Sequence, residues 1–142
     1  MRATRAAVGR PPRGAATLSR ALEEELFRCA EVLSEGSCRS GEHGSTYFGS
    51  TMISVELDRL RRVTRGGLDR EERRVLAEAV DGSVRVRLRA MRLARAEAAR
   101  RIPDRALGTV CVETRVRLTD RQLHIDVDLE ASVGVSSAAR RS

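Results

Sequence analysis

Residues 110–133 read VCVETRVRLTDRQLHIDVDLEASV, and this stretch decides the predicted fold. Apolar and polar residues alternate on both sides of the tetrapeptide 119–122, which is the pattern of two half-buried strands joined by a tight turn. A two-residue loop at 120–121 places Arg115 opposite Asp126, a favourable cross-strand pair. The stretch therefore predicts an antiparallel β-hairpin with an aliphatic face on the core and a charged face in solvent.

A single apolar stripe predicts the first helix. Its members recur every three or four residues, as on one face of a helix: Leu18, Leu22, Leu26, Cys29 and Leu33. The helix is expected to end before Gly36. The Gly- and Ser-rich residues 36–50 have no period, so they predict a long loop, which carries two of the three aromatic residues, Tyr47 and Phe48.

A second helix is expected from about Thr51 to the Gly66-Gly67 pair, whose glycines suit a helix C-terminus. Its inward residues follow helical spacing: Ile53, Leu57, Leu60 and Val63.

A third helix is expected to open at Asp69-x-x-Glu72, an acidic capping box. Its length is ambiguous, because an apolar stripe continues to Ile102, whereas Asp81-Gly82 signals a turn and residues 84–89 alternate as a strand would. One unbroken helix is the preferred interpretation, about 50 Å long at 1.5 Å per residue.

These elements predict an α+β fold with three helices packed on a C-terminal antiparallel β-hairpin and a flexible basic N-terminal arm. The predicted boundaries are 1–16 for the flexible basic arm, 17–134 for a single α+β domain and 135–142 for a flexible tail. No family resemblance is evident.

Charge is distributed unevenly along the chain. The formal net charge is +7, and every basic residue is an arginine. Residues 1–22 contain five arginines and no acidic residue, residues 23–58 are mainly acidic, and residues 59–101 are mainly basic. Opposite blocks in one small domain usually satisfy each other across packed elements or between subunits, and a phosphate-binding face is the second interpretation.

Three cysteines in a chain with its own core do not suggest a secreted disulfide scaffold. We therefore expect a cytoplasmic protein, with an organellar matrix as the alternative if the N-terminal arm is a transit peptide. No window approaches about eighteen uninterrupted apolar residues, so no membrane partner is expected.

No catalytic residue, cofactor or metal is expected. Cys29, Cys38 and His43 lack the close pairing of ligands typical of a zinc site, and the phosphate-binding motifs GxxxxGK[ST] and GxGxxG are absent. Asp126, Asp128 and Glu130 share one strand face, which the amphipathic alternation already requires, so a solvated face is the preferred interpretation.

The sequence favours a non-enzymatic structural or adaptor protein that acts through protein–protein contacts in a homo- or hetero-oligomeric assembly. The expected contact residues are Leu18, Leu22, Leu26, Tyr47 and Phe48. The alternative is a nucleic-acid-binding protein whose Arg-rich helical face and basic tails contact phosphates. Its expected phosphate-binding residues are Arg59, Arg61, Arg62, Arg85, Arg89 and Arg92. An acidic outer hairpin face and the scarcity of aromatic residues weigh against this alternative.

Overall fold

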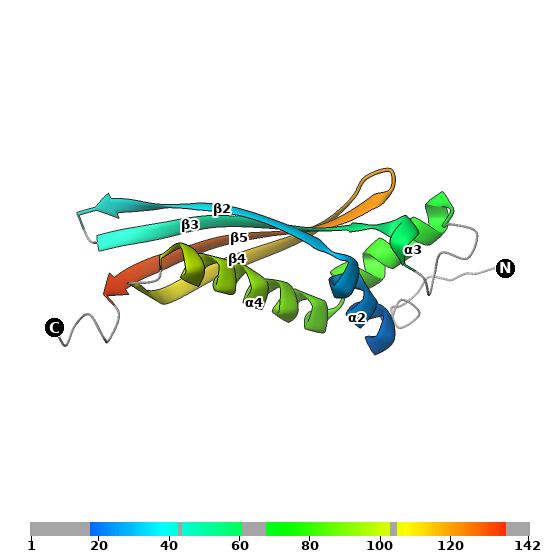
Figure 1. Cartoon of the computed structure of the whole chain (residues 1–142), viewed down its shortest axis with the longest axis horizontal. Coiled ribbons are helices and arrows are strands. Elements are labelled where there is room, and N and C mark those ends of the chain that lie inside the picture. The colour runs from blue at the N-terminus through cyan, green and yellow to red at the C-terminus, as the bar shows by residue number, and fades with distance from the viewer. Residues whose placement is uncertain (1–17, 43, 61–67, 103–104, 136–142) are drawn as a thin grey trace. The chain divides into compact units, whose positions relative to one another are not determined.

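The structure is a computed structural model that describes residues 18–42, 44–60, 68–102 and 105–135 (Figure 1). Its elements, in chain order, are helix α2 (Arg20–Cys29), strands β2 (Glu31–Gly41) and β3 (Gly44–Glu56), the 3-10 turn η2 (Leu57–Arg59), helices α3 (Arg70–Asp81) and α4 (Val84–Arg101), and strands β4 (Arg105–Leu118) and β5 (Gln122–Val135). The described strands form one sheet in the order β2-β3-β5-β4.

Neighbouring strands in this sheet run antiparallel, and one contact at each pairing defines the register. These contacts are Ser40 Oγ to Ser45 Oγ at 3.5 Å, Leu57 N–H to the Arg121 carbonyl at 2.9 Å, and Thr119 N–H to the Gln122 carbonyl at 2.9 Å. The side chains of Ser54 and His124, 2.9 Å apart, fit the same register between β3 and β5.

The predicted fold class is wrong, although the mixed α/β character is correct. Residues 31–56 form a β-hairpin where the sequence predicted a helix end, a loop and another helix. The C-terminal hairpin is present, with the expected two-residue loop, but β5 also pairs with β3. The helices therefore do not pack on an isolated C-terminal hairpin, because that hairpin is half of a four-stranded sheet.

Strand β3 forms because its buried residues alternate. Thr51, Ile53 and Val55 all lie in the interior, and Val55 is only 1% exposed. A helix from Thr51 to Gly66 would have turned Val55 away from its buried face. The β-branched side chains favour extended backbone, so alternation overrides the helical spacing of the leucines.

Helix α2 is shorter than predicted. Ser19 caps it, because its Oγ accepts a hydrogen bond from the Leu22 N–H at 3.1 Å. The helix ends at Cys29, and Leu33, the last member of the predicted stripe, lies in β2 with 64% of its surface exposed. Of the predicted stripe, Leu22, Leu26 and Cys29 lie in α2, whereas Leu18 precedes its N-cap and Leu33 follows its end.

The predicted third helix is two helices. Gly82 ends α3, where its N–H donates to the Glu78 carbonyl at 2.9 Å, and Ser83 begins α4 by accepting from the Val86 N–H at 3.2 Å. The prediction of a single helix about 50 Å long is thus wrong, whereas the prediction that residues 84–89 are helical is confirmed. The turn signal at Asp81-Gly82 and the helical stripe are therefore both correct, whereas the strand-like alternation of residues 84–89 is misleading.

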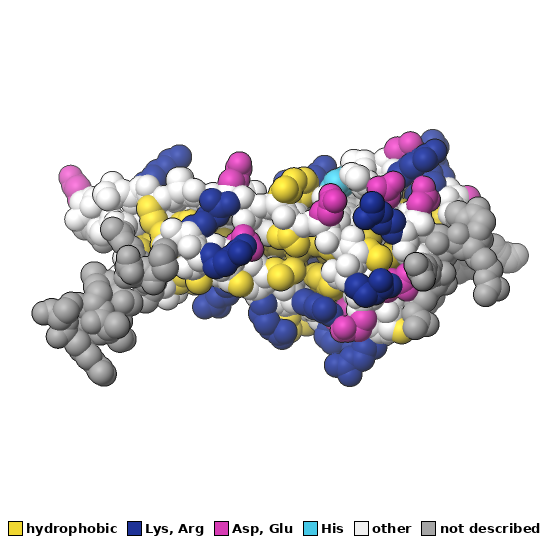
Figure 2. Space-filling model, viewed as in Figure 1, with side chains coloured by type: hydrophobic (Ala, Val, Ile, Leu, Met, Phe, Trp, Pro, Cys, Tyr) yellow, Lys and Arg dark blue, Asp and Glu magenta, His cyan; other side chains and the backbone are white. Residues whose placement is uncertain are grey.

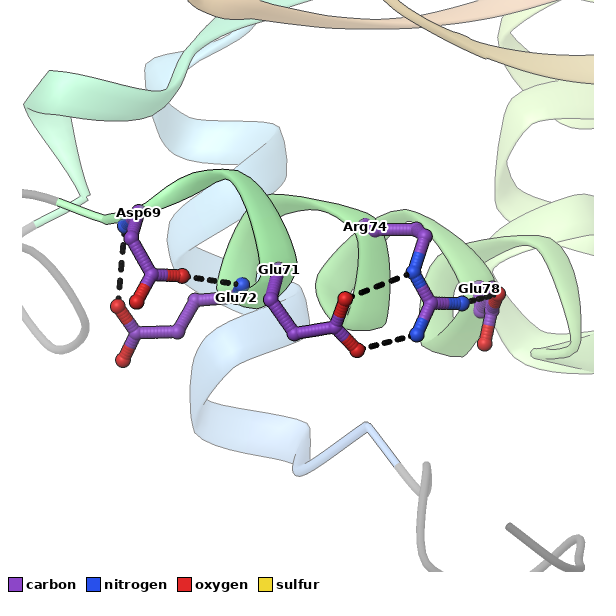
Figure 3. Close-up of polar contacts among 5 residues, drawn as sticks. All are labelled: Asp69, Glu71, Glu72, Arg74 and Glu78. Atoms are coloured by element: carbon purple, nitrogen blue, oxygen red, sulfur yellow. Dashed lines mark hydrogen bonds and ion pairs between the residues drawn. The ribbon is translucent and has the colours of Figure 1, made fainter. Parts of the chain in front are cut away.

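The capping box that opens α3 is confirmed (Figure 3). Asp69 Oδ1 accepts from the Glu72 N–H at 2.8 Å, and Glu72 Oε1 accepts from the Asp69 N–H at 3.0 Å. One turn further along, the Arg74 guanidinium pairs with Glu71 and Glu78 on the same exposed face. These local pairs support the helix where packing does not.

The chain divides into two compact units, each with its own buried residues. Unit 1 comprises residues 1–31, 54–87 and 116–124, and unit 2 comprises 32–53, 88–115 and 125–142. The core of unit 1 includes Leu18, Leu26, Val55, Leu57, Leu60, Leu76, Val80, Val86 and Leu123. The core of unit 2 includes Tyr47, Ile53, Ala90, Ala94, Ala98, Ile125, Val127, Leu129 and Ala131.

The predicted arm, 1–16, and residues 136–142 of the predicted tail lie outside the described residues. The single domain over 17–134 stays a prediction.

Candidate functional site

Unit 2 carries a hollow of about 760 Å³ on its part of the sheet. Three consecutive residues from each of the four strands line it: 35–37, 48–50, 111–113 and 128–130. All of these residues belong to unit 2. The hollow is therefore a property of the sheet surface itself.

The hollow lies on the sheet face opposite helix α4. On the helix side, the Ser34 hydroxyl donates to Glu97 Oε1 at 2.8 Å, and Ala90, Ala94 and Ala98 of α4 are buried. Because successive side chains of a strand point to opposite faces, Glu35 and Ser37 face away from α4.

Four carboxylates surround the hollow in two rows across the strands. The register gives one row of Ser37, Phe48, Glu130 and Cys111, and a second row of Glu35, Ser50, Asp128 and Glu113. Asp128 therefore lies directly opposite Glu113 on the neighbouring strand, and like charges in that position destabilise a sheet. A cation in the hollow would relieve this repulsion.

Phe48 supplies the aromatic surface of the hollow and already contacts one cation. It is half-buried, and the Arg39 guanidinium carbon lies 5.2 Å from its ring centroid. This geometry is a cation–π contact, in which the negative face of the ring attracts the positive group. The chain itself thus shows that this ring accepts a guanidinium.

The reactive side chains in the lining of the hollow are few. Its lining contains one thiol, Cys111, and no histidine, so no nucleophile lies beside an imidazole base there. In the described ranges, no group of three or more His, Cys, Asp or Glu side chains is arranged to hold a metal ion. The lining therefore combines four carboxylates with the half-buried ring of Phe48.

A polar cluster on the helix side holds β2 against α4. Besides Ser34, Glu97 contacts Arg100, and Arg101 donates to the Ser34 carbonyl. The Ser34 hydrogen bond is the main cause that lowers the pKa of Glu97. Burial raises the pKa of nearby Tyr47 above 10.0. This cluster fixes the edge strand that supplies Glu35 to the hollow.

The predicted contact residues are divided between core and surface. Leu18 and Leu26 are buried in unit 1, and Leu22 is half-buried there. Tyr47 is buried in unit 2, and Phe48, its neighbour on β3, is the one member of this set that lines the hollow.

The predicted phosphate-binding arginines differ in their surroundings. Arg61 and Arg62 lie outside the described residues. Arg85 pairs with the buried Glu23 at 2.9 Å, and the half-buried Arg89 also has an interaction partner. Arg59 and Arg92 are exposed. Figure 2 shows arginine side chains gathered over α4. On this helix Arg87 pairs with Asp81 and Arg100 pairs with Glu97.

Sequence reasoning noticed half of the acidic set and missed the rest. The sequence favours a solvated strand face for Asp128 and Glu130, places Glu35 at the end of the predicted first helix and does not single out Glu113. The missing signal for Glu35 was the pairing of β2 and β3, because only the order β2-β3-β5-β4 brings it beside the carboxylates of the C-terminal hairpin.

Within the described ranges, no helix is both long enough and apolar enough to cross a membrane. No protein-family model, curated protein or solved structure matches the chain.

Proposed function

We propose that the protein is a non-enzymatic structural or adaptor protein that acts through protein–protein contacts, with the hollow of unit 2 as its contact surface. The partner is a segment that carries basic side chains. The observation that carries this proposal is the set of four carboxylates around a half-buried phenylalanine: Glu35, Glu113, Asp128 and Glu130 beside Phe48.

Electrostatics supports a basic partner. No ion pair within the described residues engages these four carboxylates, so their charge is available to a ligand. Clustered charge of one sign in a depression raises the local concentration of the opposite charge and speeds association. Arginine suits the site better than lysine, because its planar group pairs with a carboxylate through two parallel hydrogen bonds, while Arg39 of the same chain already contacts the Phe48 ring.

The test is fluorescence anisotropy with a labelled peptide of alternating glycine and arginine, GRGRGRGR, and the full chain. Glu35→Gln combined with Asp128→Asn is expected to raise the Kd about tenfold, since two exposed ion pairs together contribute roughly that factor. The matched control combines Glu56→Gln with Asp120→Asn, which removes two exposed carboxylates of unit 1. Equal losses in the two double variants would show that only net charge attracts the peptide.

Nucleic-acid binding is a second candidate, supported by one observation. Arg92 and Arg95 are exposed on α4 and form no ion pair within the described part of the chain. Phosphate contacts would make the affinity for a mixed-sequence duplex fall steeply between about 50 and 200 mM salt. Arg92→Ala with Arg95→Ala should then weaken binding and flatten that salt dependence.

A further inference from the structure

The spacing of the carboxylates across the sheet restricts which segments fit the hollow. Glu35 and Asp128 lie in the same row with one strand between them. Strands in a sheet are about 4.8 Å apart, so these two positions are separated by about 10 Å. A ligand that reaches both needs two positive groups with that separation, and its middle passes over Ser50, with Phe48 in the adjacent row.

The chain contains a segment with this chemistry. Residues 1–17 carry Arg2, Arg5, Arg10 and Arg13 and no acidic residue. They lie outside the described residues, and residues 10–13 read Arg-Pro-Pro-Arg.

A peptide of that sequence favours polyproline II geometry, because each proline fixes φ close to the value of that helix. Polyproline II has three residues per turn and rises about 3.1 Å per residue, so two arginines three residues apart share one side at about 9 Å. Proline-rich segments of this kind dock on aromatic surfaces in known recognition modes. The spacing of the two arginines therefore matches the spacing of Glu35 and Asp128, with Phe48 beside the path between them.

We propose that the hollow receives residues 10–13 of a second copy of this chain, with the two arginines at Glu35 and Asp128 and the prolines over Ser50, beside Phe48. This inference rests on the proposed function and names its partner. Charge complementarity supports it, because an acid-free arm with four arginines meets a surface with four carboxylates. An arm that enters a different surface on the next copy is a head-to-tail contact, so chains add one to another as concentration rises.

Analytical ultracentrifugation of the nuclease-treated full chain, over a range of micromolar concentrations and at two salt concentrations, tests this contact. The average mass is expected to rise with concentration and to fall with salt. Arg10→Ala with Arg13→Ala removes the arm contact, and Glu35→Gln with Asp128→Asn removes the hollow contact. Each double variant should weaken association about tenfold or more. The controls are Arg140→Ala with Arg141→Ala for the arm, and Glu56→Gln with Asp120→Asn for the hollow, both of which should associate like the parent chain.

Mixing the two association-deficient double variants gives the sharpest result. The arm variant keeps its hollow and the hollow variant keeps its arm, so a mixture should form a one-to-one pair that grows no further. Neither loss of folding nor a general charge effect produces that rescue. A mixture that stays monomeric, or an arm variant that associates like the parent chain, overturns the proposal.

Two other results would overturn it in distinguishable ways. If the parent chain stays monomeric while the arm variant binds a labelled peptide of residues 8–15 more tightly than the parent does, the occupant is the arm of the same copy. If GRGRGRGR binding depends on Glu35 and Asp128 but self-association does not, the proposed function stands and this partner is wrong. Failure of the peptide to respond to the hollow variants removes both proposals.

Discussion

Replacing Gly36 by alanine is expected to destabilise the chain by about 2–4 kcal/mol, because the methyl group would meet a buried ring. A Cβ at residue 36 would lie 2.0 Å from the Tyr47 hydroxyl oxygen and 2.5 Å from the carbon that carries it. Non-bonded atoms prefer about 3.5 Å, so the ring or the strand must move by more than about 1 Å.

The ring has little room to move. A Cβ at Gly49 would lie 2.6 Å from Tyr47 Cε2, so the side chain packs directly against the backbone of two glycines. Tyr47 is itself only 2% exposed. Crowding of a packed core typically costs about 1–3 kcal/mol, and complete loss of a buried aromatic side chain costs about 3–5 kcal/mol. The expected value lies between these two limits.

A double-mutant cycle with Tyr47→Leu isolates the contact. In the leucine background the obstructing ring is absent, so Gly36→Ala should be neutral or stabilising by about 0.5–1 kcal/mol, since alanine costs less conformational entropy than glycine in a strand. Urea unfolding followed by circular dichroism gives the four free energies. Tyrosine fluorescence adds a local probe, because Tyr47 is the only tyrosine and the chain has no tryptophan.

Gly41→Ala is the matched control in the same strand. A Cβ there meets only the Gly44 carbonyl oxygen at 3.5 Å, an ordinary contact, so the change in stability should stay within about 0.5 kcal/mol. Equal destabilisation by Gly36→Ala in the tyrosine and leucine backgrounds would refute the proposed packing of the ring on the glycines.

Three further predictions follow from local contacts. Tyrosinate absorbance should show Tyr47 ionising at higher pH in the folded chain than in urea, since burial raises its pKa above 10.0; because the unfolded chain then loses its proton first, stability should fall as pH rises above about 10. Ser34→Ala should raise the pKa of Glu97 in a carbon NMR titration, and because the lowered pKa stabilises the fold above the unfolded-state value of about 4.5, the variant should lose less stability in acid than the parent chain does. Asp69→Ala should cost about 1 kcal/mol in urea unfolding, whereas Asp69→Asn should cost much less because asparagine is an equally good N-cap.

The elements that the sequence predicted correctly are those whose signals are local. The C-terminal hairpin has strict alternation and a two-residue loop, and α3 has a complete capping box. These patterns depend on neighbours within a few residues, so tertiary contacts do not change their meaning.

Strand β2 could not be predicted because it lacks an apolar face. Most of its residues are exposed, and the positions that face α4 include Ser34 and Gly36. The space above Gly36 is filled by the Tyr47 ring from the neighbouring strand. The buried surface that stabilises β2 therefore comes from other parts of the chain, and its own sequence resembles a loop.

The hollow could not be predicted either, because it also depends on contacts between distant segments. Asp128 and Glu130 are visible as one face of a strand, and Glu113 lies on the adjacent strand of the same hairpin. Glu35 joins them only through the order β2-β3-β5-β4, which places an acidic residue of the N-terminal hairpin in the same row. A row of side chains that crosses four strands cannot be predicted from residue spacing within one segment.

The acidic side chains of the fold differ in whether an ion pair neutralises them. The sequence suggested that its acidic and basic blocks satisfy each other, and part of this occurs, since the buried Glu23 pairs with Arg85 at 2.9 Å. A buried charge must be paired because its desolvation is otherwise too costly. The hollow carboxylates are under no such constraint, because they lie at the surface, and no ion pair in the described residues engages them. Their clustering even costs stability where Asp128 faces Glu113 across the strands. Under the proposed function, a positively charged group bound from outside would offset this repulsion.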